Sequence, residues 1–196
     1  MGLIRYAIPA DLAEPGTWIT EPGRRSAVRL ALDFVPFAGI AFLWFVGVLR
    51  NLLGDQEDKF FATVFLGSGL LFIASLFGAA AVTDALIESV AVGNIGSETY
   101  YFGRCMSDAL LNLFAMKMAG VFMFSTCTIG LRSAIIPRYM AFIGYACGLL
   151  LLLVIANWRW ITLVFPIWML LISSQILLTE FRSRGVRAAG AEHYRG

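Results

Sequence analysis

The chain has 196 residues, of which 59% are hydrophobic and only 14% are charged, and its mean hydropathy is +0.78. A soluble domain carries about 25% charged residues, so this composition excludes an ordinary soluble domain and indicates a membrane protein. The net charge of +2 is too small to favour a nucleic-acid partner, and the arginines lie mostly at the ends of apolar segments. Arginine outnumbers lysine thirteen to two, which is typical of a bacterial protein from a GC-rich genome.

The first segment, residues 1–26, reads MGLIRYAIPADLAEPGTWITEPGRRS and contains three prolines and two Pro-Gly pairs. Such residues break a long helix, so we expect this segment to lie outside the lipid or at its interface. The apolar stretch that follows is too long for a signal-peptide core and has no small-residue cleavage site after it. We therefore expect a retained membrane helix.

Five apolar stretches follow, and several reach the roughly 17 to 25 residues that a helix needs to cross about 30 Å of hydrocarbon. The sequence predicts an all-α fold, a polytopic transmembrane bundle of five spanning helices within residues 27–180, followed by a basic tail at 181–196. The helical pattern of the second stretch continues as far as Val92, and residues 82–105 could also form a re-entrant segment. The acidic residues in that region make a lipid-exposed sixth helix improbable. The predicted spans are Ala27–Leu49, with Pro36 as a kink, Phe60–Ala81, Ala109–Leu131, Arg138–Ala156 and Ile161–Leu178.

The distribution of arginines gives only a weak preference for orientation. With five crossings, Arg24, Arg25 and Arg29 lie on the opposite side from Arg132 and from the basic tail. Positively charged loops favour the cytoplasm, and we expect a multi-pass protein of the inner (plasma) membrane with a cytoplasmic C-terminus.

Lys117 stands out because it is the only lysine within a predicted span. At 1.5 Å per residue, Asp33 lies roughly 9 Å and Lys117 roughly 12 Å below the surface from which both helices enter. A charge at this depth is costly unless it is paired or hydrated, so we expect an interior Lys117 within reach of Asp33. A structural ion pair and a snorkelling lysine are the simpler alternatives. The candidate intramembrane polar cluster is Asp33, Lys117, Asp84, Glu88 and Asn112.

The sequence lacks the motifs of enzymes and of cofactor sites. The only histidine, His193, lies in the polar tail, and the three cysteines are about twenty residues apart, which predicts neither haem nor a metal cluster nor a disulfide framework. No GxSxG, HExxH, P-loop or GxGxxG stands in the right context. The GxxxG pattern Gly144–Gly148 and the related Ala74–Gly78 predict close helix packing, with oligomerisation as the alternative.

Two blocks of the chain resemble a family of uncharacterised multi-spanning bacterial membrane proteins, mainly actinobacterial. The blocks are VPFAGIAFLWFVGVLRNLLGDQEDKFFATVFLGSGLLF and FAMKMAGVFMFSTCTIGLRSAIIPRYMAFIGYACGLLLLL. The resemblance implies a basic residue at position 117 and the helix end from Phe122 to Arg132, and it implies no activity.

These observations favour a non-enzymatic protein without a cofactor. We expect a small accessory or structural subunit whose partners are the bilayer and other membrane subunits or copies of itself. The alternative is a small transporter or proton-coupled channel with a polar half-cavity around Asp33 and Lys117. An enzyme acting on lipid head groups is a third possibility, with Glu98, Arg104 and Asp108 as its candidate residues.

Overall fold

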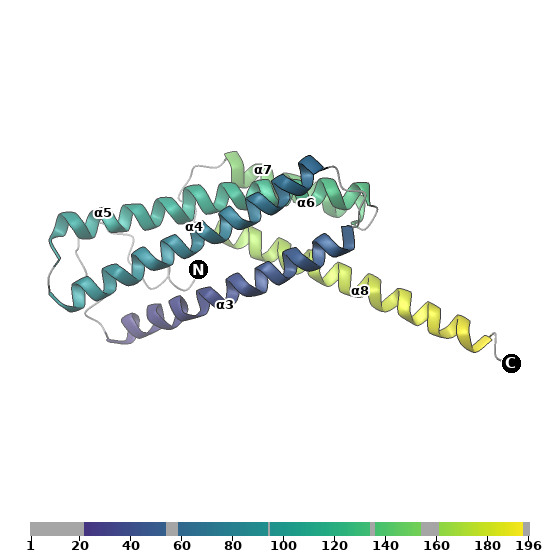
Figure 1. Cartoon of the computed structure of the whole chain (residues 1–196), viewed down its shortest axis with the longest axis horizontal. Helices are drawn as coiled ribbons and strands as arrows, with labels where there is room; N and C mark the ends of the chain where they lie inside the picture. The colour runs from purple at the N-terminus through teal and green to yellow at the C-terminus, as the bar shows by residue number, and fades with distance from the viewer. Residues whose placement is uncertain (1–21, 54–58, 94, 134–135, 154–160, 194–196) are drawn as a thin grey trace.

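The computed structural model describes residues 22–53, 59–93, 95–133, 136–153 and 161–193, and within these ranges every regular element is helical (Figure 1). Two long helices come first, α3 and α4. Then α5, a π-helical segment η1 and α6 follow one another without a break. The bounds are α3 Pro22–Leu53, α4 Lys59–Ala91, α5 Ser97–Asp108, η1 Ala109–Ala115, α6 Met116–Arg132, α7 Arg138–Leu153, the short 3₁₀ turn η2 Ile161–Leu163 and α8 Val164–His193.

The predicted all-α bundle is confirmed, and the molecule is a membrane protein. Four helical runs are long and apolar enough to cross a bilayer, namely Gly23–Asn51, Ala62–Ala91, Ser97–Arg132 and Ile161–Leu178. The fifth apolar helix, Arg138–Leu153, has 16 residues and is shorter. At 1.5 Å per residue it is about 24 Å long, less than the roughly 30 Å of a hydrocarbon core.

Residues 82–105 belong to the end of α4 and the start of α5, joined by a short turn. Gly93 has a φ of 69°, a left-handed conformation that costs glycine little, and it lets the chain reverse directly after α4. The described residues between 82 and 105 therefore contain neither a re-entrant segment nor a further crossing.

Helix boundaries differ from the prediction at three places. The third helical run begins at Ser97, not at Ala109, and α3 begins at Pro22. The helix α8 continues through the predicted tail as far as His193. Pro36 lies inside α3, which continues past it. The end of the predicted span Arg138–Ala156 and most of the segment 1–26 lie outside the described residues.

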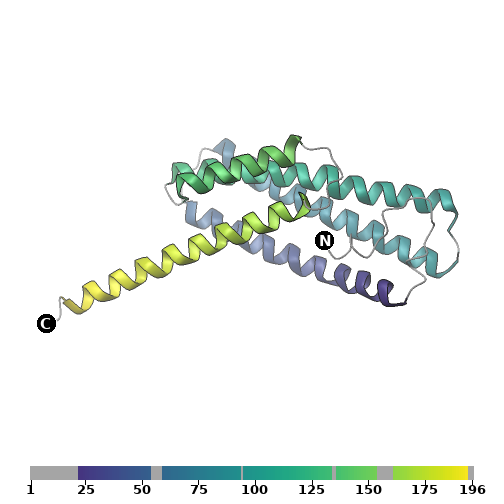
Figure 2. The same cartoon turned by 180° about the vertical axis from the view of Figure 1, so that it is seen from behind.

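The helix α4 lies at the centre of the arrangement. It packs against α3 on one side and against α5, η1 and α6 on the other, while α7 lies along α6 (Figures 1 and 2). The first half of α8 crosses the bundle, and its second half projects away from it, as both views show. Among the described residues, the α5 end of the molecule therefore consists of α3, α4 and α5.

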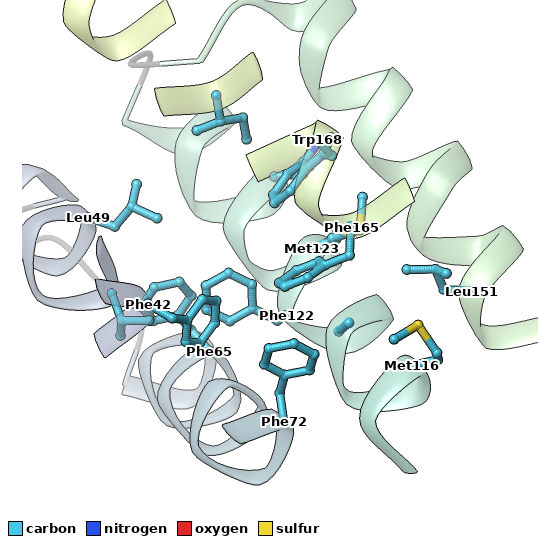
Figure 3. Close-up of a cluster of buried hydrophobic side chains, with 14 of the residues drawn as sticks. Phe42, Leu49, Phe65, Phe72, Met116, Phe122, Met123, Leu151, Phe165 and Trp168 are labelled. Carbon is cyan, nitrogen blue, oxygen red and sulfur yellow. The ribbon is translucent and has the colours of Figure 1, made fainter. Parts of the chain in front are cut away.

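Phenylalanines hold four helices together where α8 crosses (Figure 3). Phe165 of α8 lies 4.8 Å from Phe72 of α4 and 5.9 Å from Phe42 of α3, measured between ring centroids. Phe122 of α6 stacks on Phe65 of α4 at 4.8 Å. Lipid tails are as apolar as these rings, so the tight fit of the aromatic surfaces, more than removal from water, stabilises this contact.

A second, smaller core lies at the α5 end of the bundle. It contains Val28 and Leu32 of α3, Leu86 and Ile87 of α4, and Tyr100 of α5. Burial of Tyr100 explains why the polar sequence SETYYF is helical, since tertiary packing outweighs its weak local preference.

Candidate functional site

Lys117 binds a neighbouring helix. Its Nζ donates a hydrogen bond to the backbone carbonyl of Leu152, in the last described turn of α7. An ammonium group has three donors and needs such acceptors within an apolar helix. The ammonium of Lys117 therefore joins α6 to α7.

Close contact between α6 and α7 places Lys117 beside that carbonyl. A Cβ atom added to Gly120 would lie 2.9 Å from the carbonyl oxygen of Gly148, and one added to Gly148 would lie 3.1 Å from that of Gly120. One added to Gly144 would lie 2.3 Å from Sγ of Cys127. The GxxxG pattern Gly144–Gly148 is thus a packing motif between two helices of the same chain, as expected.

The predicted pairing of Lys117 with Asp33 is not formed. Asp33 is exposed on α3, and the described residues contain no ion pair between the two. The late predicted start of the third helix led to this error. Asp33 lies about 16 Å along its helix from Pro22, whereas Lys117 lies about 30 Å along the run that starts at Ser97. Their depths therefore differ by about 14 Å, and α4 packs between the two helices.

The other three candidates lie near the α5 end of the bundle and do not converge with Lys117. Glu88 forms an ion pair with Arg29 of α3. Asp84, one turn before Glu88 in α4, is exposed. Asn112, within η1, donates a hydrogen bond to Asp108 of α5. Lys117, Glu88 and Asn112 thus have separate partners, and Asp33 and Asp84 are exposed, so the five predicted residues do not gather in one cluster.

Helix lengths indicate that this end lies beyond the hydrocarbon. The run Ser97–Arg132 has 36 residues, or about 54 Å, compared with a hydrocarbon thickness of about 30 Å. The charged residues Glu98, Arg104 and Asp108 all lie in α5, so we place the excess length at the Ser97 end of the run. Lys117 lies about 14 Å further along this run than Asp108, within its apolar part.

Hydroxyl groups join α4 to α5 at the boundary between these regions. Ser107 contacts Thr83 at 2.8 Å, and both hydroxyls donate to the carbonyl of Ala79. The sequence analysis missed this network, because a serine and a threonine 24 residues apart carry no recognisable pattern. It also treated Arg29 only as a topology signal.

The hydroxyl groups on α6 form hydrogen bonds with their own backbone and, in one case, with α7. Ser125, Thr126 and Thr128 each donate to the carbonyl four residues earlier, as expected, and Thr128 also contacts the hydroxyl of Tyr145 on α7 at 2.8 Å. These groups have structural partners and need no ligand to explain them.

Among the described residues, no three His, Cys, Asp or Glu side chains gather as a metal site would require. Of the residues considered for head-group chemistry, Glu98 is exposed in the first turn of α5 and Asp108 accepts the hydrogen bond from Asn112.

The comparisons with known proteins give no match: no family model, no curated protein and no solved structure is significantly similar to this chain. The resemblance to uncharacterised bacterial membrane proteins stays a prediction.

Proposed function

We propose that the protein is a non-enzymatic subunit of a membrane assembly, formed either with other membrane proteins or with further copies of itself. The observation that carries this proposal is the projecting half of α8. The helix continues from the apolar stretch Ile161–Leu178 as far as His193, and its second half has left the bundle (Figures 1 and 2).

A projecting helix of this kind calls for a partner. Isolated helices of about 12 to 15 residues are marginal in water, and residues 179–193 are only that long. Packing against another chain supplies the stabilisation that the bundle does not. The first half of α8 also packs on one side only, through Phe165, Trp168 and Ile172, and exposes Ile167, Leu170 and Leu171 on the other.

The assembly proposal includes a location. We place the protein in a bacterial inner membrane with the projecting end of α8 in the cytoplasm, because Arg182, Arg184 and Arg187 follow directly after its apolar stretch. A C-terminal fusion to alkaline phosphatase should then be inactive, and a C-terminal fluorescent protein should be bright. The reverse result would contradict this orientation.

Native mass analysis after extraction in a mild detergent tests the assembly. We expect a mass above that of one 21.5 kDa chain, either as a homo-oligomer or with a co-purifying subunit. A chain that ends at Thr179 should lose the association and keep its helical content. A clean monomer of the full-length protein would refute the proposal.

The transport alternative has no comparable support. Its proposed lining residues have separate contacts, with Lys117 on Leu152 and Glu88 on Arg29. We therefore retain the subunit proposal.

A further inference from the structure

We propose that Lys117 is the centre of a lateral docking surface for a transmembrane helix of another subunit, one that carries a carboxylate at the same depth. This inference rests on the proposed function, because it names the side of the bundle and the chemistry that the partner would use. The decisive feature is an intramembrane cation whose one partner within the described residues is a backbone carbonyl.

The charge balance at Lys117 favours an acidic partner. An ammonium group has three donors, and the carbonyl of Leu152 accepts from one of them. A helix end contributes at most about half a negative charge, so α7 does not neutralise the ammonium. A charge at the middle of a bilayer costs several kcal/mol unless an opposite charge is near. A carboxylate on a partner helix would supply both the missing charge and further acceptors.

The surroundings of Lys117 fit a helix approaching from the side. The lysine is half-buried, so part of its side chain is accessible from outside the bundle. Exposed apolar side chains flank it on both helices: Leu113 and Phe114 lie in η1 one turn before it, and Leu149 and Leu153 lie in the last turns of α7. The result is an apolar surface with a single cation near its centre.

Among the described residues, the exposed carboxylate within an apolar span is that of Asp33, which lies about 14 Å from Lys117 in depth, so a copy inserted in the same direction does not bring these two together. Charge complementarity therefore points to a different chain.

Designed peptides provide a direct test. The labelled full-length protein is placed in vesicles of zwitterionic phosphatidylcholine with polyleucine transmembrane peptides that carry Glu, Gln or Leu at the centre, and association is followed by Förster transfer. We expect the Glu peptide to bind about tenfold more tightly than the Leu peptide, the effect of one good polar contact in a membrane. Lys117→Arg should retain this preference and Lys117→Gln, which can still donate to Leu152, should remove it. Lys59→Gln, at the start of α4, is the matched control and should leave it unchanged.

Equal binding of the three peptides to the unmodified protein would overturn the inference, as would a preference that survives in Lys117→Gln. Vesicles containing phosphatidylglycerol form a second arm, and loss of Glu-peptide binding there would assign the site to an anionic lipid and also overturn it. Size-exclusion profiles and circular dichroism establish that each variant is folded. The proposed function is tested separately: an oligomer whose unmodified form shows no peptide preference would refute only the docking site, and a monomer that still selects the Glu peptide would refute only the assembly.

Discussion

At the scale of single residues, Lys117 has an immediate structural role as a link between α6 and α7. A charge within an apolar span is costly unless it has a partner. Its flexible side chain reaches the backbone carbonyl of Leu152 on the neighbouring helix. The one lysine within an apolar span thus connects two helices of the bundle.

Exchanging the charges of Asp33 and Lys117 tests their independence. Because the two residues lie on opposite sides of α4 and at different depths, Asp33→Lys combined with Lys117→Asp should be no more stable than Lys117→Asp alone. Expression level and thermal stability in detergent are the measurements. Recovery in the double variant would show that the two groups interact after all.

Close contact at Gly120 gives a second prediction at this scale. The added methyl of Gly120→Ala meets a backbone oxygen at 2.9 Å, so α7 has to move, and we expect a loss of about 1 to 3 kcal/mol in the free energy of unfolding. Gly67→Ala on α4 is the control, because nothing lies within 4 Å of its added Cβ. Unfolding in mixed detergent should separate the two variants, and equal stabilities would contradict the described contact.

At the scale of elements, α5 is the helix whose formation depends most on packing against its neighbours. Its residues are too polar for a membrane span, yet it continues η1 and α6 as one run and packs on α4. The close fit of Gly103 against Leu86, where an added Cβ would lie 2.7 Å from the leucine side chain, fixes this packing. Three helices thereby form a small core beyond the apolar part of the bundle.

That small core should depend on packing more than on its ion pair. Ile87 is fully buried there, so Ile87→Ala should cost about 2 to 5 kcal/mol. The side chains of Arg29 and Glu88 are 39% and 57% exposed, so Glu88→Gln should cost about 1 kcal/mol or less. Thermal unfolding of the two variants gives the comparison. A larger loss of stability in Glu88→Gln than in Ile87→Ala would show that the ion pair matters more than the packing.

At the scale of the whole molecule, the two ends of the bundle differ. At one end, α3, α4 and α5 extend past α7 and α8, and at the other, the second half of α8 projects away from the bundle (Figure 1). The helices α7 and α8 pack beside α6 and do not reach the α5 end. The helix α7 can be short in this arrangement, because α3, α4 and the run that begins with α5 form the extended end.

The native cysteines report on this arrangement. Cys105 on α5 is exposed and Cys127 on α6 is buried. A membrane-impermeant maleimide should label Cys105 in intact cells if α5 projects outward, and Cys127 should remain unlabelled. Cys105→Ser is the control and should abolish the signal. Labelling only after permeabilisation would reverse the orientation, and none in either case would place α5 within the hydrocarbon.

The sequence by itself determined the class of the molecule and the approximate position of most of its helices. Long apolar stretches have one solution in a bilayer, because backbone groups in lipid must bond within their own segment. The role of Gly144–Gly148 was also readable, since small residues four apart allow two backbones to approach.

Only the tertiary structure decided where the third helix begins, and that boundary decided the site. The segment from Ser97 to Asp108 is polar, and its helical form comes from burying Tyr100 against α3 and α4, contacts between residues far apart in the chain. Moving the start of the helix by twelve residues shifted Lys117 by about 18 Å relative to that start. The carbonyl that Lys117 binds, on Leu152, is a backbone group and has no signature in a sequence.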